Sequence, residues 1–571
     1  MLESFKGYRK STFKSDLIAG LTVAVIFVPQ AIAYAYLAGM PPIYGLYAGL
    51  IPLVVYAIMG TSRHMSIGPV AVSAILVMSG VSQLADPFSD QYVVLTIFAG
   101  LLIGITQIIL SILRLGFLVN FLSHPVIAGF ISAAAVIIII SQLKDFLGFE
   151  IPRMESSFDT LVYAIENISN AHLLTAAICL ASLVIMLVLK KWKKSFPSAL
   201  LVVVLSTFLT WLFKWDQMGV GIIKEVPQGL PSFMIPEYSM QTVIDLLPTV
   251  FTVTFIGVVE SIGIAKTLEM KHKSYVVRPN QELLALGTSK VIGSFFQALP
   301  TSGSFTRSAI NDNAGAKSGV ASLITAFLVM LALLFLTPLF YYIPKAVLAA
   351  IILVSVYKLI DVSEAKYLWK TRRRDFITMI LTFIVTLVLG IEVGVFAGII
   401  LSFMLLLYSS SLPHVVELGN IKGTNVYKNI QRFPEAIVDE DSLAIRFDNQ
   451  LIFSNANYFK DSIKSFLLKR EHRPKYLILD ASNIHDMDST GVHALKDVND
   501  ILVKLEIQLY ISGATGPVRD ILKRSGFMDE LGKNRQFLHV FDAVEAIQSP
   551  SHSIENNNHA TQFNLRKKKP T

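Results

Sequence analysis

Two short stretches of this chain combine backbone-breaking residues with the start of an apolar helix, an arrangement suited to binding a small anion. In the first, Gly68 and Pro69 interrupt an apolar run, and a new helix is expected from Val70. In the second, Gly303 precedes a helix that is expected to begin at Ser304. The first N–H groups of a helix lack partners within the helix, and the helix dipole adds partial positive charge there. Each break therefore predicts a place where backbone N–H groups can hold an anion.

Two charged residues accompany these breaks. Arg307 follows the second break, and Glu260 lies in the middle of the apolar stretch TFIGVVESIGIAKTL. A carboxylate inside a membrane span is costly and usually faces a cavity, where it marks an ion or proton path. We therefore predict that Glu260 couples transport to protons and that Arg307 shapes the potential of the anion site. The alternative for both is a permanent ion pair, Glu260 with Arg307 or with Lys266.

Most of the chain is too apolar for a soluble protein: its 571 residues are 53% hydrophobic and only 16% charged. About fourteen apolar segments follow one another between residues 17 and 412. The third, 69–82, and the tenth, 305–314, are short and broken, and they occupy matching places in two groups of seven. This pattern predicts an all-α polytopic membrane domain built as an inverted repeat, with the substrate held near the midplane.

The distribution of charge predicts the orientation in the membrane. The formal net charge is +8 at pH 7, and the cations gather in short loops beside apolar segments. The positive-inside rule then predicts a multi-pass protein of the cell (inner) membrane with both termini in the cytoplasm. The cations form no basic reading face, so nucleic-acid binding is not expected. The chain has one cysteine, Cys179, which excludes an intrachain disulfide and a cysteine-rich metal site. No metal and no cofactor are expected.

Composition changes abruptly after Pro413, where charged residues begin to alternate with short apolar runs. The stretches SLAIRFDN, LIFSN, KYLILDASN and IQLYISG are expected as strands, with helices between them, which predicts a small α/β domain. The tail has too little apolar content to fold and is expected to be disordered. The expected parts are a cytoplasmic N-terminus (1–16), a membrane domain (17–413), a linker (414–433), an α/β domain (434–548) and the tail (549–571).

These motifs resemble a known family. The stretch PPIYGLYAGLIPLVVYAIMGTSRHMSIGPVAVSAILV looks like the signature of the sulfate permease (SulP) family of anion transporters. It is preceded by VPQAIAYAYLAG and followed, in the second half, by SFTRSAIN. The stretch HDMDSTGVHAL resembles the loop of a STAS domain (sulfate transporter and anti-sigma factor antagonist). The resemblance covers nearly the whole chain.

The resemblance implies a 7+7 inverted repeat divided into a core and a gate domain, assembly as a homodimer, and an anion held between the N-termini of the third and tenth helices. Carried over by position, the pocket would be lined by Gln30, Tyr34, Val70, Ser304, Phe305, Thr306 and Arg307. Bland alternatives exist for several of them. Gln30 could bond carbonyls freed at Pro29, and Tyr34 could be interior packing.

The resemblance also bears on coupling and substrate. Sodium-coupled members are expected to carry a hydroxyl one turn after the carboxylate, where this chain has Ile264, and hard cations prefer several oxygen ligands. Proton symport is therefore preferred, and sulfate is the first choice of substrate. Helix N-termini accept bicarbonate, chloride or a dicarboxylate almost equally well, so a transporter or exchanger of one of these anions stays open, as does an uncoupled channel.

Two features of the remaining sequence concern regulation and energy supply. Thr490 matches the position that is phosphorylated in anti-sigma factor antagonists, although Asp486 and Asp488 would repel a phosphate. Phosphorylation of Thr490 is thus a possible regulatory event and the less favoured reading. In NAGAKSG, Ala316 replaces the glycine that a phosphate-binding loop requires before Lys317, so the chain is not expected to be an ATPase or another enzyme.

Overall fold

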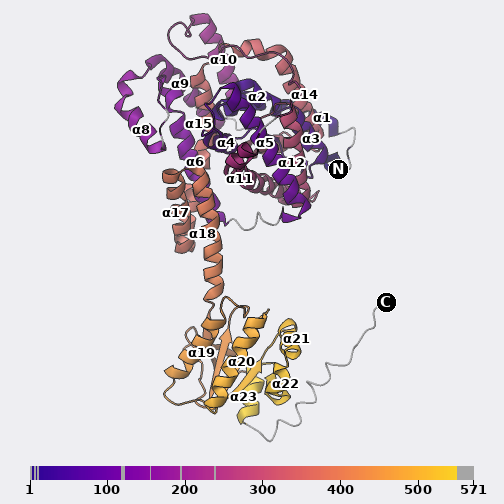
Figure 1. Cartoon of the computed structure of the whole chain (residues 1–571), viewed down its shortest axis with the longest axis vertical. Helices are drawn as coiled ribbons and strands as arrows, with labels where there is room; N and C mark the ends of the chain where they lie inside the picture. The colour runs from indigo at the N-terminus through magenta and orange to yellow at the C-terminus, as the bar shows by residue number, and fades with distance from the viewer. Residues whose placement is uncertain are drawn as a thin grey trace. The chain divides into compact units, whose positions relative to one another are not determined.

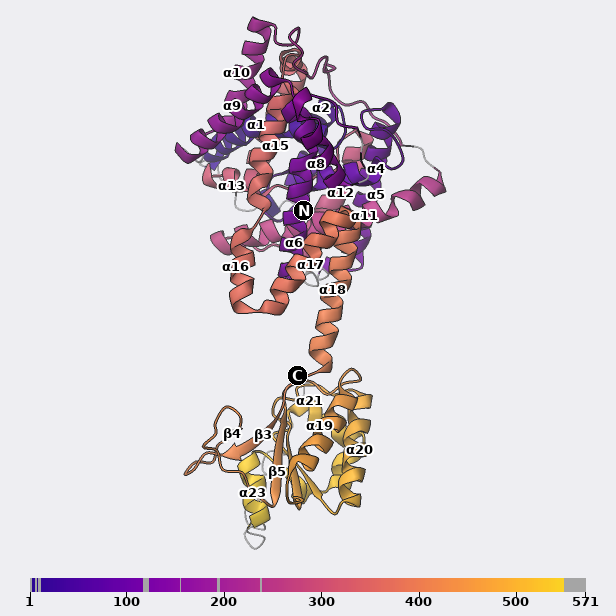
Figure 2. The ribbon, with the colours of Figure 1, turned by 90° about the vertical axis from the view of Figure 1, so that its left-hand side faces the viewer.

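The computed structural model describes residues 3–5, 8, 12–116, 123–152, 154, 156–192, 196–236 and 239–548. The chain divides into two compact units, Met1–Ser402 and Phe403–Thr571. The expected disordered tail, 549–571, lies outside the described residues, as does part of the expected N-terminal segment. Figures 1 and 2 show the first unit as a bundle of helices and the second as a sheet with helices on its faces.

Apart from the two-residue strands β1 (Ile67–Gly68) and β2 (Ser302–Gly303), the regular structure of the first unit is helical. Its α-helices are α1 (Phe13–Leu37), α2 (Pro42–Tyr47), α3 (Ile51–Met59), α4 (Ala71–Val81), α5 (Asp90–Ile112), α6 (His124–Ser141), α7 (Leu143–Leu147), α8 (Ser157–Glu166), α9 (Leu173–Trp192), α10 (Ser198–Phe213), α11 (Met240–His272), α12 (Pro279–Phe295), α13 (Phe305–Asn313), α14 (Val320–Leu331), α15 (Lys345–Val356), α16 (Val362–Thr371), α17 (Arg373–Leu389) and α18 (Ile391–Ser411).

Among the described residues, nine helical segments are long and apolar enough to cross a membrane, counting adjoining helices such as α2 and α3 together. Two shorter apolar helices, α4 and α10, add to them. The predicted fold class, a helical membrane domain followed by a small α/β domain, is confirmed. α4 and α13 fall on the third and tenth predicted segments and have only 11 and 9 residues, too few to span a bilayer at 1.5 Å per residue.

The two broken segments meet in space. β1 (Ile67–Gly68) and β2 (Ser302–Gly303) pair in antiparallel fashion, with Ile67 opposite Gly303 and Gly68 opposite Ser302. α4 begins three residues after β1, and α13 begins two residues after β2. All four strand residues are buried. The antiparallel pair therefore places the N-termini of both short helices at one location inside the bundle, as an inverted repeat requires.

The helices of the first unit form two packing groups. In one, α12 packs on α5 and α3, α11 packs on α5 and α4, and α1 packs on α2, α13 and α14. In the other, α17 packs on α6, and α15 packs on α9, α6 and α7. Both views show α4, α5, α11 and α12 close together (Figures 1 and 2). The groups touch along α1, which also contacts α10 and α15, and along α4, which contacts α6 and α15.

Glycine permits the closest of these helix contacts. A Cβ added to Gly45 of α2 would lie 2.0 Å from the carbonyl oxygen of Ala31 in α1. On α5 and α12, Gly104 and Gly287 face each other, and a Cβ on either would lie within 2.8 Å of the other's carbonyl oxygen. Small residues let membrane helices approach closely and gain van der Waals contact, which stabilises their packing in lipid.

The second unit is a six-stranded sheet in the order β4-β3-β5-β6-β7-β8. Its strands are β3 (Val415–Asn420), β4 (Tyr427–Asn429), β5 (Ser442–Phe447), β6 (Tyr476–Asp480), β7 (Gln508–Ser512) and β8 (Gln536–Phe537). β3 pairs antiparallel with β4 and β5, and the pairs from β5 to β8 are parallel. One face packs on α19 (Ala456–Lys469), α20 (Ser489–Lys504), α21 (Gly516–Arg524) and α22 (Phe527–Leu531), the other on α23 (Val540–Gln548).

Two expectations for this region differ from the structure. Residues 414–433, expected as a linker, contain β3 and β4, because Val415–Leu418 pairs with β5 and Leu418–Asn420 pairs with β4. LIFSN, expected as a strand, forms only an isolated bridge from Leu451 to Met487 before α19 begins. The other three expected strands correspond to β5, β6 and β7.

Candidate functional site

The N-termini of α4 and α13 lie beside the antiparallel pair of β1 and β2. The first backbone N–H groups of both helices are therefore directed toward this strand pair. Val70 is the N-cap of α4 in extended conformation and has no side-chain hydrogen bond to the helix. Ser304 is the N-cap of α13, and its hydroxyl accepts a hydrogen bond from the Arg307 N–H at 3.3 Å. Both residues are buried, at 5% and 7% exposure. The remaining first-turn N–H groups of both helices have no partner within the helix and are available to an anion.

Serine hydroxyl groups connect the pair of β1 and β2 to the neighbouring helices α4 and α11. The Oγ atoms of Ser73 in α4 and Ser302 in β2 lie 3.0 Å apart. The Gly303 N–H donates to Ser261 Oγ in α11 at 2.8 Å. Hydroxyls are compact and can donate and accept, so they satisfy irregular backbone where no water or lipid can. Neither Ser73 nor Ser261 is recognisable from the sequence, because single serines in apolar segments carry no distinguishing pattern.

Ser66, the residue before β1, connects the same strand pair to α13. Its N–H donates to Ser308 Oγ at 2.9 Å, and its carbonyl oxygen accepts from the Ser304 N–H at 3.0 Å. Two turns further along α13, Asn311 Nδ2 donates to the His64 carbonyl oxygen at 2.9 Å. The loop before α4 is therefore tied to α13 along its length, so the two helix starts keep a fixed separation.

Arg307 is the side chain that dominates the charge of this region. It is fully buried at 0% exposure, and its Nη1 donates to Gln30 Oε1 in α1 at 3.3 Å. Within the described part of the chain, Nε and Nη2 have no hydrogen-bond partner. The guanidinium carbon lies 5.0 Å from the ring centroid of Phe27, a cation–π distance. A buried cation with two open N–H groups is costly unless another group of opposite charge binds it.

Because Gly68 has no side chain, Arg307 can lie beside the pair of β1 and β2. A Cβ at this position would approach the Phe27 ring to 2.6 Å and Arg307 Nη2 to 3.0 Å. Phe27 and Gln30 lie on successive turns of α1, which brings the first predicted helix to the guanidinium. The structure thus brings together Gln30, Val70, Ser304 and Arg307. Tyr34, one turn beyond Gln30, is buried at 6% exposure.

The other two predicted pocket residues present a different picture. Phe305 is 63% exposed, and Thr306 is also exposed. Consecutive residues of a helix point about 100° apart, so the turn that buries Arg307 turns these two side chains outward. Their backbone N–H groups still belong to the first turn of α13. In this conformation, Phe305 and Thr306 therefore supply backbone N–H groups to the candidate site, and their side chains lie outside it.

Glu260 has no ion-pair partner among the described residues. Its Oε2 atom is buried without a hydrogen bond, and Lys266 instead contacts Glu269 at 2.7 Å. The neighbouring Ser261 accepts a hydrogen bond from Gly303 of β2. Glu260, on the same helix α11, therefore lies close to the pair of β1 and β2. The permanent pairs with Arg307 or Lys266 that the sequence left open are not formed in this structure.

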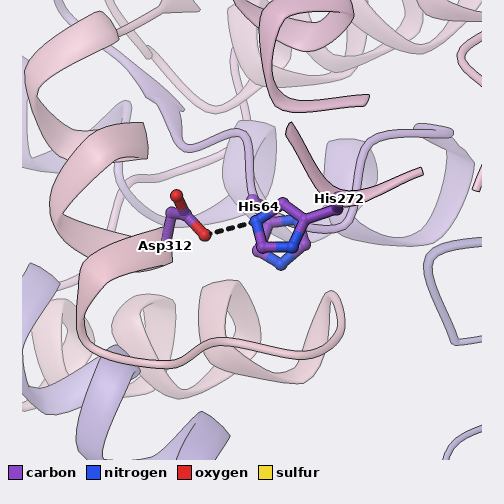
Figure 3. A group of neighbouring side chains, drawn as sticks. All are labelled: His64, His272 and Asp312. Carbon is purple, nitrogen blue, oxygen red and sulfur yellow. Dashed lines mark hydrogen bonds and ion pairs between the residues drawn. The ribbon is translucent and has the colours of Figure 1, made fainter. Parts of the chain in front are cut away.

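A second polar cluster, His64, His272 and Asp312, lies at the ends of the loop before β1, of α11 and of α13 (Figure 3). The two imidazole rings stack with centroids 4.1 Å apart and planes 8° apart. His272 Nε2 lies 2.5 Å from Asp312 Oδ1, and Lys271 forms an ion pair with the same carboxylate. The in-plane lone pairs of stacked rings lie in separate, nearly parallel planes and do not converge on one ion, and Asp312 is already paired twice, so this geometry favours hydrogen bonding and ion pairing over metal ligation.

Glu282, at the start of α12, is a buried carboxylate that the sequence did not single out. It accepts hydrogen bonds from Tyr56 OH at 2.7 Å, Thr61 N–H at 2.6 Å and Ser62 N–H at 3.1 Å. Fully satisfied buried carboxylates fix structure. Glu282 therefore fixes the position of the loop that leads from α3 to β1.

In the C-terminal domain, Asp488 is the N-cap of α20. One of its oxygens accepts from the Gly491 N–H at 2.7 Å, and the other accepts from the Phe453 N–H at 2.8 Å. Thr490 lies in the first turn of α20 and is exposed. The carboxylate of Asp488 already satisfies the helix start, which leaves less positive potential there for a phosphate.

Comparisons with known proteins agree with this architecture. The sulfate permease family matches residues 13–382, and the STAS domain matches residues 433–547. Sulfate transporter 4.1, chloroplastic, of Arabidopsis thaliana is 38% identical over 550 residues, covering 93% of this chain and 80% of the relative. High affinity sulfate transporter 2 of Stylosanthes hamata is 34% identical, covering 95% and 85%.

Solved structures are similar over the whole chain or its membrane part. The murine Solute Carrier 26 family member A9 anion transporter, in an inward-facing state, superposes with a TM-score of 0.88 at 26% identity, covering 95% of this chain and 93% of that one. The membrane domain of the cyanobacterial bicarbonate transporter BicA has a TM-score of 0.61 at 22% identity, covering 68% and 98%, and supports the fold alone. The chain belongs to the sulfate permease family, is a multi-pass membrane protein with a C-terminal STAS domain, and transports anions rather than catalysing a reaction.

Proposed function

We propose that this protein is a secondary active transporter of sulfate that works by proton symport. The observation that carries the proposal is Arg307, fully buried with two open N–H positions beside the paired starts of α4 and α13. The anion would lie between these helix N-termini and accept hydrogen bonds from backbone N–H groups and from the guanidinium. Sulfate offers four oxygens to such a set of donors, and guanidinium binds oxyanions with paired N–H groups.

The preference for sulfate rests on the relatives, whose names include sulfate transporters at 34% and 38% identity. The donors themselves would also accept bicarbonate, chloride or a dicarboxylate, because helix N-termini and one arginine do not distinguish these anions by charge alone. A competition experiment is therefore part of the test below.

Glu260 is the proposed proton carrier. Its Oε2 atom is buried and has no hydrogen-bond partner among the described residues. The next residue, Ser261, accepts a hydrogen bond from Gly303 of β2, so the protonation state of Glu260 would influence the anion site. When Glu260 is ionised, its negative charge opposes an anion nearby, and when it is protonated this repulsion is absent. Binding of a proton and binding of the anion would thus favour each other, which is the thermodynamic requirement for symport.

Alternating access would follow from the two packing groups of the first unit. The group that contains α4, α11 and α13 carries the candidate site as one body, and the group that contains α6, α15 and α17 would serve as the gate. Movement of one group against the other exposes a fixed site to each side in turn. We further propose a homodimer in the cell membrane with both termini in the cytoplasm, as the loop charges predict.

The decisive test is uptake of radiolabelled sulfate into proteoliposomes of the purified full-length protein under an inward proton gradient. Wild type should accumulate sulfate, and collapse of the gradient should abolish accumulation. Unlabelled bicarbonate, chloride and succinate are added as competitors. Absence of sulfate uptake together with block by one competitor would refute sulfate and identify that anion instead.

Coupling is tested by Glu260→Gln, which keeps the shape of the side chain and removes its titration. This variant should still bind sulfate and exchange it across the membrane, but it should lose accumulation driven by protons. The matched control is Glu269→Gln on the same helix, which breaks only the contact with Lys266. Undiminished proton-driven uptake in the Glu260 variant would contradict the symport proposal.

A further inference from the structure

The helix α16 and the first turn of α17 form a basic and aromatic hairpin. The sequence of residues 362–376, VSEAKYLWKTRRRDF, contains five cations and two carboxylates. Lys366, Lys370, Arg372 and Arg373 are all exposed. Such a density of cations beside a membrane span exceeds what a turn between helices needs.

Aromatic side chains stand among these cations. Trp369 is 52% exposed and Tyr367 is 60% exposed, whereas Leu368 between them is buried and anchors α16. The Arg373 guanidinium lies 5.3 Å from the Trp369 ring centroid, and the ring of Phe376 meets Trp369 edge to face at 4.9 Å. Exposed Trp and Tyr are typical of the membrane–water interface, where an amphipathic ring lies at the level of lipid headgroups.

The two carboxylates of the hairpin do not neutralise its face. Glu364 contacts His124 at 3.2 Å, at the start of α6. Asp375 contacts Arg372 at 3.9 Å, a loose pair between half-exposed groups. Among the described residues, Lys366 and Lys370 have no carboxylate within ion-pair distance. The face therefore keeps a positive charge at the depth where Trp369 and Tyr367 lie.

We propose that this hairpin binds the headgroup of an anionic phospholipid. The phosphate would be held by Lys366, Lys370 and Arg373, and the acyl chains would lie against Trp369 and Phe376. Charge complementarity selects the occupant, since basic residues beside a membrane attract anionic lipid, and interfacial aromatics set their depth.

The test uses the full-length protein in detergent, with native mass spectrometry to count retained lipids. Phosphatidylglycerol should remain bound to wild type more often than phosphatidylcholine added at the same concentration. The variant Lys366→Gln/Lys370→Gln/Arg373→Gln should retain phosphatidylglycerol about tenfold less, since each cation near the surface contributes to the attraction. The charge-matched control is Lys422→Gln/Lys428→Gln/Lys464→Gln, which removes three exposed lysines of the C-terminal domain and should retain lipid as wild type does.

Thermal unfolding gives a second readout that does not depend on transport. Phosphatidylglycerol should raise the melting temperature of wild type and of the control variant, and not that of the hairpin variant. Equal retention of both lipids by wild type, or equal retention of phosphatidylglycerol by the hairpin variant, would overturn the proposal. So would the same stabilisation by water-soluble glycerol 3-phosphate, because the site would then bind a free phosphate ester. These outcomes are independent of whether sulfate is the transported anion.

Discussion

Replacing Arg307 by glutamine tests the candidate anion site directly. The change removes the charge and the two open N–H positions, Nε and Nη2, while a glutamine amide can still reach toward Gln30. Hydrogen bonds to charged groups contribute about 1.5–3 kcal/mol each. If the anion accepts from both open positions at the lower end of this range, the loss is about 3 kcal/mol. Since about 1.4 kcal/mol is a factor of ten, the sulfate dissociation constant should rise roughly 100-fold.

The same structure predicts the effect on stability. Arg307 has no carboxylate within ion-pair distance among the described residues, so the variant breaks no ion pair. Removing a buried charge without a counter-charge relieves a desolvation cost. The melting temperature measured without anion should therefore stay the same or rise, while the stabilisation of wild type by added sulfate should disappear. Arg307→Lys should fall between, because lysine keeps the charge and loses the planar fork.

Sulfate binding to purified protein and uptake into proteoliposomes measure the two effects separately. The control is Lys290→Gln, another buried cation of the membrane unit, whose Nζ donates to Gln107 Oε1 at 3.0 Å within the α5–α12 contact. It should leave the sulfate dissociation constant within about twofold of wild type. An unchanged dissociation constant in Arg307→Gln, or a fall in its melting temperature in anion-free buffer, would refute the reasoning and make Arg307 a structural residue.

Three further predictions concern neighbouring residues. Gly68→Ala should lower sulfate uptake at least tenfold in protein that still folds, since its Cβ would displace Phe27 and Arg307, whereas Gly263→Ala, with nothing within 4 Å, should transport normally. Thr306→Val should lower uptake less than threefold, because its exposed side chain is not what faces Arg307; a loss as large as that of Arg307→Gln would contradict this. Burial and the adjacent His272 ring lower the pKa of His64 to about 4, so the folded protein keeps this ring neutral while the unfolded chain protonates it near pH 6.5. Stability should therefore fall as pH drops from about 6.5 to 4, and thermal unfolding of His64→Gln should show a smaller fall.

Much of the fold could be predicted because the bilayer restricts what a sequence can do. Every backbone polar group in hydrocarbon must be satisfied within the chain, so long apolar runs become helices and interruptions mark irregular backbone. The breaks at Gly68 and Gly303 were recognisable for this reason, and they became β1 and β2. The strand pairing between them was not predictable from local pattern, because it joins residues more than 230 positions apart in two-residue strands. The linker expectation over 414–433 met the same difficulty, since β3 is defined by its pairing with β5.

The candidate site was predictable in its composition and less so in its orientation. Gln30 and Arg307 were both identified, but only the structure shows that they contact each other. The family resemblance places Phe305 and Thr306 in the pocket by position, whereas the helical turn directs their side chains outward and that of Arg307 inward. The supporting serines and Glu282 carried no sequence signal, because their roles depend on partners from distant helices.

The two halves of the membrane unit contribute unequally to this site, and that inequality has a consequence for selectivity. The first half supplies backbone N–H groups from α4 and the amide of Gln30, which are neutral. The second half supplies Arg307 and Glu260, which carry formal charge beside the paired helix starts. Electrostatic attraction between charges decides how strongly a divalent anion is preferred over a monovalent one, while neutral donors fix where its oxygens lie. Substitutions at Arg307 or Glu260 should therefore change the ratio of sulfate to chloride affinity, whereas substitutions at Gln30 or Ser73 should weaken both anions in similar proportion.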